Sequence, residues 1–72
     1  MHSHTYKVVE IVSTSTKGLE DAIRSGIARA SESLRHVRWF EVISTRGMVD
    51  DGVIGHFQVT MKVGFTLDDS GP

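Results

Sequence analysis

The stretch "GHFQVTMKVGF", residues 55 to 65, has the clearest periodicity in this chain of 72 residues. Apolar and polar side chains alternate along it, which is the pattern of a β-strand with one buried side. The apolar positions are Phe57, Val59, Met61, Val63 and Phe65, and the polar positions are His56, Gln58, Thr60 and Lys62. We expect the apolar series to form the centre of a core and the polar series to lie on the other side of a sheet.

A turn and a second strand precede this stretch. In "GMVDDG", residues 47 to 52, Asp51 and Gly52 favour the left-handed backbone of a hairpin turn. The preceding strand is expected near residues 38 to 46, and neither of its sides is cleanly polar. One side carries Trp39, Glu41, Ile43 and Thr45, and the other carries Phe40, Val42, Ser44 and Arg46. With a single helix available to cover them, these apolar groups predict burial against another copy of the chain.

A first strand, "YKVVEIVS" at residues 6 to 13, is followed by an amphipathic helix of about five turns. Ser15 or Thr16 is the expected N-cap. Gly26, which weakens a helix, indicates close approach of another element. The apolar stripe consists of Leu19, Ile23, Ile27, Ala30 and Leu34.

The predicted fold is therefore α+β, in the order β-α-β-β, with one amphipathic helix packed on a three-stranded antiparallel sheet. Residues 1–72 make a single domain, with residues 1–4 and 68–72 expected to be loose termini. A domain of this length buries only about 60% of the surface that its unfolded chain exposes. Because the chain has no cysteine to form disulfides, we expect oligomerisation to supply the missing burial.

Composition narrows the function classes. Eight basic and nine acidic residues give a net charge of −1, so the chain lacks the basic excess of a nucleic-acid-binding domain. Its apolar runs fall far short of the ~20 residues that span a bilayer. We expect a cytoplasmic protein that binds neither nucleic acid nor membrane.

No motif predicts catalysis or a metal. The glycines of "GMVDDGVIG" have the wrong spacing for a dinucleotide site and are assigned to turns. His2 and His4 could bind a divalent cation as a tail, although solvated histidines are the simpler interpretation, and His36 and His56 match no zinc spacing. Arg46 could form a surface salt bridge or a ligand contact, and Trp39 could fill an interface or serve as a platform for a ligand.

Four segments together resemble the dodecin family of small flavin-binding proteins over nearly the whole chain. They are "VVEIVSTS", "GLEDAIRSGIARASESLRHVRWFEV", "STRG" and "GHFQVTMKVGF". The resemblance includes a tryptophan directly after the helix, a glutamine nineteen positions later, and the closing "VGF". It implies a hollow homododecamer that binds flavins at subunit interfaces.

The resemblance also implies site residues. Trp39 would stack on the flavin, so that two flavins lie between two symmetry-related indoles, Gln58 would contact the flavin edge, and Arg46 would belong to the same site. FMN is the expected ligand, with riboflavin or FAD as alternatives. Some family members are also associated with coenzyme A. In this chain Arg29 and Arg35 are the candidate contacts for its phosphates. Thr66 departs from the pattern, since some members carry an arginine at this position.

Residue chemistry agrees with these roles. An electron-rich indole and an electron-poor flavin ring favour offset stacking, the Gln58 amide offers both a donor and an acceptor, and the Arg46 guanidinium suits a phosphate or a ring carbonyl. We therefore expect a flavin storage and buffering protein that is not an enzyme. The alternatives are a flavin-dependent reductase and an oligomeric interaction module that binds no flavin.

Overall fold

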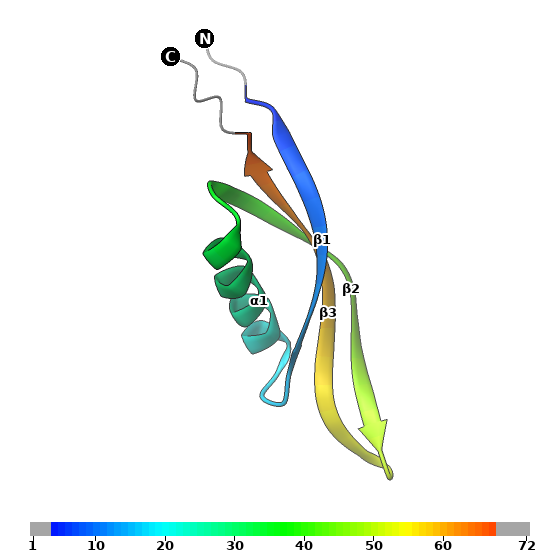
Figure 1. Cartoon of the computed structure of the whole chain (residues 1–72). Coiled ribbons are helices and arrows are strands. Elements are labelled where there is room, and N and C mark those ends of the chain that lie inside the picture. The colour runs from blue at the N-terminus through cyan, green and yellow to red at the C-terminus, as the bar shows by residue number, and fades with distance from the viewer. Residues whose placement is uncertain (1–3, 68–72) are drawn as a thin grey trace.

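The computed structural model describes residues 4–67, which form one helix and a three-stranded antiparallel sheet. The elements follow the order β1 (Tyr6–Ser15), α1 (Leu19–Ser33), β2 (Val37–Asp50) and β3 (Val53–Thr66). The strand order is β1-β3-β2, so the strand with the clearest alternation is the central one. Figure 1 shows α1 on one side of this sheet. The predicted fold class is confirmed.

The core lies between α1 and β3. Val59, Met61 and Val63 are fully buried, as the alternation predicts, and Ala22 of the helix is buried in one cluster with Val59 and Met61. Gly26 is also buried, and a Cβ atom built on it would lie 2.6 Å from Met61 Cε and 2.9 Å from Ser13 Cβ. The expected close approach at Gly26 is confirmed.

Three details of the helix differ from the sequence-based expectation. Its buried line is Ala22, Gly26 and Ala30, because these small residues let α1 approach the sheet closely; Ala30 was predicted, whereas Ala22 and Gly26 stand one position before the predicted Ile23 and Ile27. Ile23 and Ile27 are only partly buried beside this line. The helix spans 15 residues, which is about four turns and not five.

The helix cap also differs. The N-cap residue is Gly18, which offers no side-chain hydrogen bond, so neither Ser15 nor Thr16 occupies that position. Ser15 instead joins the end of β1 to the first turn of α1. Its hydroxyl donates to Asp21 Oδ2 at 2.7 Å and accepts from the Lys17 backbone N–H at 2.9 Å.

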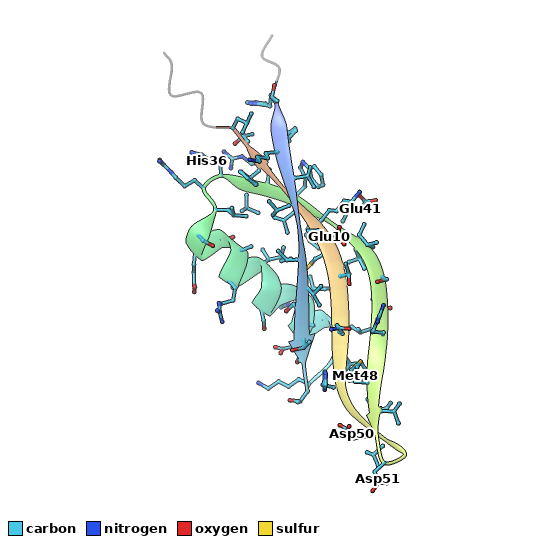
Figure 2. The ribbon with its side chains drawn as sticks, turned by 45° about the vertical axis from the view of Figure 1, so that its right-hand side comes forward. Glu10, His36, Glu41, Met48, Asp50 and Asp51 are labelled. Carbon is cyan, nitrogen blue, oxygen red and sulfur yellow. The ribbon has the colours of Figure 1, made fainter. Side chains whose placement is uncertain are left out.

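The β2–β3 hairpin is longer than expected, because β2 continues through residues 47–50. Its turn lies where the sequence predicted it, with φ of 55° at Asp51 and 80° at Gly52. Since β1 ends opposite Phe57, the hairpin beyond this point has no third strand beside it. Figure 1 shows the hairpin extending past β1, and Figure 2 places Asp50 and Asp51 at its tip. Met48, Val49, Val53 and Ile54 are all exposed on this arm.

Candidate functional site

The side of the sheet away from α1, called here the open face, contains the candidate flavin residues. Residues paired across neighbouring antiparallel strands share a face, so the register defines this surface. Its members are Tyr6, Val8, Glu10, Val12 and Thr14 of β1, Trp39, Glu41, Ser44, Arg46 and Met48 of β2, and His56, Gln58, Thr60, Lys62, Gly64 and Thr66 of β3. Figure 2 shows Glu41 on this side, away from the helix.

Trp39 lies at one end of the open face. A bulge at Arg38 shifts the register of β2, so that Trp39 and not Arg38 pairs with Gly64. The indole lies across Gly64, where a Cβ atom would overlap the ring. The Tyr6 ring meets the indole edge-on, with centroids 6.0 Å apart and planes at 71°. Trp39 remains 37% exposed, so an aromatic surface is available to a ligand.

Arg46 and Gln58 lie together toward the other end of the face. The sequence pattern put Arg46 on the opposite side of β2 from Trp39, and that expectation is wrong. A second bulge makes Ile43 an extra residue between Val42 and Ser44, which inverts the alternation of the rest of β2. Arg46 therefore pairs with Gln58 on the open face.

The two ends of the face are well separated within one chain. Gly64, beneath Trp39, and Gln58 are six residues apart on β3, a rise of about 20 Å. A charged row of Glu10, Lys62 and Glu41 crosses the sheet between them. A single subunit therefore does not bring Trp39 together with Gln58 and Arg46.

The candidate phosphate residues Arg29 and Arg35 lie elsewhere. Arg29 is on α1 and borders a groove between the helix and β1 that also contains Ser25 and Ser33. Its Nε atom is 3.9 Å from Glu32 Oε1, in a highly exposed pair. Arg35 follows the end of α1 and is not on the helix as expected. Neither arginine belongs to the open face.

The histidines form no metal centre in the described part of the chain. Within residues 4–67 there is no group of three histidine or acidic residues that could hold a metal ion. His4 lies beside Tyr6, with ring centroids 6.4 Å apart. His2 lies outside the described residues. Of the termini predicted to be loose, residues 1–3 and 68–72 also lie outside them.

Sequence reasoning missed two residues that contact Trp39. Tyr6 was treated only as part of a strand, and nothing in its local pattern links it to Trp39. Gly64 had a usable signal, because a glycine inside a strand marks close approach of another group. The arrangement offers a flat aromatic surface at one end of the open face, and an amide beside a guanidinium at the other.

Comparison with known proteins places this chain in a family. The family model described as Dodecin matches residues 5–68. A curated dodecin from Thermus thermophilus is 46% identical over 65 residues, which cover 90% of this chain and 94% of that protein. Among residues 4–67 the one helix, α1, is too short and too polar to span a bilayer.

Two solved structures agree with the family match. The dodecin from Streptomyces davaonensis has a TM-score of 0.90 and 56% identity, covering 94% of this chain and all of that one. The dodecin from Streptomyces coelicolor has a TM-score of 0.89 and 46% identity, covering 96% of this chain and 99% of that one. Because sequence and fold match over nearly the full length, this chain belongs to the dodecin family.

Proposed function

We propose that this protein binds FMN by stacking it on Trp39 at interfaces between identical subunits, and that it stores and buffers the flavin. The observation that carries the proposal is the indole itself. It lies flat on the open face and is 37% exposed. A broad, electron-poor ring system such as the isoalloxazine of FMN, riboflavin or FAD matches such a surface by size and by quadrupole.

The separation along the open face supports a site shared between subunits. Gln58 lies about 20 Å along β3 from the residue beneath Trp39, too far to contact the edge of a ring stacked on the indole of its own subunit. A second copy can supply Gln58 and Arg46 to that ring. Arg46 is exposed and makes no ion pair with any residue from 4 to 67, so its charge is available to a phosphate or ring carbonyl.

Self-association has further support in the apolar surface of one chain. Phe40 is 46% exposed beside Ile23 and Ile27, in an open groove between α1 and β2. The hairpin arm exposes four more apolar residues. We propose that copies of this chain cover these surfaces in a homododecamer. Its location in the cytoplasm stays a prediction.

A flavin titration tests the binding. Adding ligand-free protein to FMN should strongly lower flavin emission, because the stacked indole donates an electron to the excited ring and returns it without light. Such quenching would also limit flavin photochemistry in the cell. Trp39→Ala should weaken FMN binding by about tenfold or more while the mass of the assembly stays unchanged. Full emission at saturating protein would refute the proposal.

The same site residues allow a sharper version of this test. Gln58→Ala and Arg46→Ala should each weaken FMN binding without removing the quenching of the flavin that remains bound, because Trp39 is intact. Thr14→Ala is a matched control, since Thr14 shares the open face with Gln58 but carries no predicted role. Equal affinity in Gln58→Ala and Thr14→Ala would remove Gln58 from the site.

Coenzyme A is a second candidate ligand, favoured by the groove that Arg29 shares with Ser25 and Ser33. A cation among hydroxyl groups is suited to a phosphate. Calorimetric titration with coenzyme A, compared with an Arg29→Ala variant, tests this role, and a parallel Arg35→Ala variant tests the other candidate. Heat unchanged by both substitutions would exclude the arginines.

The remaining alternatives predict different results. A flavin-dependent reductase needs one ring face open for hydride transfer, so steady oxidation of NADH by the FMN-loaded protein would favour it. An interaction module without flavin would remain a large, colourless oligomer that leaves FMN emission unchanged. The absorption spectrum and mass of the protein as purified distinguish these outcomes together.

A further inference from the structure

Gly64 and Tyr6 surround Trp39 in a way that the stacking role alone does not require. Gly64 is the residue paired with Trp39 across the sheet, and it is buried although it lies on the open face. The atoms closest to a Cβ built at Gly64 are Cδ2, Cε2 and Cζ2 of the indole. Two of these are the carbons shared by both rings, so Gly64 lies beneath the middle of the indole.

This position leaves one ring face for a ligand. The face toward β3 rests on the backbone at Gly64, and the 37% exposure of Trp39 therefore belongs to the opposite face and the free rim. Any side chain at residue 64 would have to occupy the space that the indole fills. The indole would then rise from the sheet or turn to another rotamer, because side-chain torsions occupy discrete wells.

Tyr6 restricts the other freedom of the ring. It pairs with Thr66, two residues along β3 from Gly64, so it stands diagonally across the central strand from Trp39. Its 6.0 Å, 71° approach is the edge-to-face geometry that aromatic pairs prefer. A ring packed beside the indole at this angle restricts rotation of the indole within the plane of the sheet.

We propose that Gly64 and Tyr6 are the positioning residues of the ligand platform: Gly64 sets the height of the Trp39 indole above the sheet, and Tyr6 fixes its orientation. This inference rests on the proposed flavin function for its ligand, but the position of the indole can be measured without any ligand. Stacking depends on plane separation and offset, so a displaced indole loses its partner even though the tryptophan is still present.

Two pairs of variants test the proposal. Gly64→Ala is compared with Gly47→Ala, because Gly47 also lies in a strand but a Cβ there meets nothing within 4 Å. Tyr6→Leu, which removes the aromatic ring, is compared with Tyr6→Phe, which keeps the ring and removes only the hydroxyl. Affinity is measured by quenching of FMN emission, and the mass of the assembly is checked for every variant.

We expect Gly64→Ala to weaken FMN binding by about tenfold or more, and Tyr6→Leu by roughly threefold or more, with Gly47→Ala and Tyr6→Phe within about twofold of the unaltered protein. A Gly64→Ala assembly with unaltered FMN affinity would overturn the proposal for Gly64. Equal losses in Tyr6→Leu and Tyr6→Phe would overturn it for Tyr6, since the ring edge would then be irrelevant. If Gly64→Ala does not fold, the Tyr6 pair still decides the orienting role.

A ligand-free measurement separates this proposal from flavin binding. Trp39 is the only tryptophan in the chain, so the emission and near-ultraviolet circular dichroism of the protein report on this ring alone. Gly64→Ala should increase quenching of Trp39 emission by acrylamide, because both ring faces become accessible, whereas Gly47→Ala should not. If the unaltered protein ignores FMN but this difference is seen, the proposed function fails and the positioning role stands. If FMN binds and the difference is absent, the positioning role fails alone.

Discussion

Because α1 packs closely on the sheet at Gly26, we predict that Gly26→Ala changes the free energy of unfolding in the direction opposite to that expected from helix propensity. An exposed glycine in a helix is improved by alanine, which gains about 1 kcal/mol of helix propensity. Gly26→Ala should instead lower the free energy of unfolding. The new methyl would lie 2.9 Å from Ser13 Cβ, which cannot rotate away because it is attached to the β1 backbone. The contact with Met61 Cε, at 2.6 Å, is easier to relieve because that methyl ends a flexible side chain.

The magnitude follows from these distances. Carbon atoms pack at about 3.5–4.0 Å, so α1 must withdraw by roughly 0.6–1 Å from β1, and contacts along Ala22 and Ala30 weaken. Overpacking of this kind costs about 1–3 kcal/mol. After the gain of about 1 kcal/mol from helix propensity, we expect a net loss of about 1 kcal/mol.

Denaturant unfolding at a fixed protomer concentration measures this loss, because the apparent stability of an oligomer depends on concentration. Ser25→Gly and Ser25→Ala, at the exposed neighbouring position, measure helix propensity alone. In a Ser13→Gly background the clash with Ser13 is absent and only the contact with the flexible Met61 side chain remains, so Gly26→Ala should lose most of its penalty, with a coupling of about 0.5–3 kcal/mol. A stabilised Gly26→Ala single variant would refute the reasoning, since it would show that the helix has room at this position.

Two further predictions concern stability and assembly. His36, between α1 and β2, has φ of 63°, a left-handed conformation that costs a side chain about 1–2 kcal/mol. His36→Gly should therefore raise the free energy of unfolding by up to about 1 kcal/mol after the extra chain entropy of glycine, and a thermal scan that shows clear destabilisation would contradict this. Ile54 is 60% exposed on the hairpin arm. Ile54→Glu should lower the mass of the assembly in analytical ultracentrifugation while the circular dichroism of the sheet persists, and an intact assembly would mean that this arm is not an interface.

The sequence predicted those features that depend on local pattern. The alternation of residues 57 to 65 located the central strand and the core, Asp51 and Gly52 located the turn, and Gly26 located the close approach of the helix. Each follows from side-chain size or backbone freedom at a single position. The β-α-β-β order followed from these elements together.

Features that depend on pairing between strands were not predictable in this way. The bulge at Ile43 leaves almost no trace in the sequence, because the adjacent apolar residues Val42 and Ile43 are also compatible with a regular strand. The buried side of the helix was predicted correctly at Ala30, but Ala22 and Gly26 were missed in favour of Ile23 and Ile27, because small residues carry little hydrophobic signal although they decide how close α1 comes to the sheet. The contact between Tyr6 and Trp39 joins residues that are distant along the chain, so only the register of the sheet reveals it.

The unpaired Ile43 has a consequence for how members of this family are aligned. If a relative kept this residue but had a regular strand in place of the bulge, Ile43 would pair with Thr60, every later side chain of β2 would exchange sides, and Arg46 would move opposite Phe57, beneath the helix. Two relatives could then keep the same tryptophan, arginine and glutamine and yet present them on opposite surfaces. A one-residue gap at Ile43 would instead leave Arg46 opposite Gln58, because Ser44 would then follow Val42 in a regular ladder, so equal length does not guarantee that two members share the same open face.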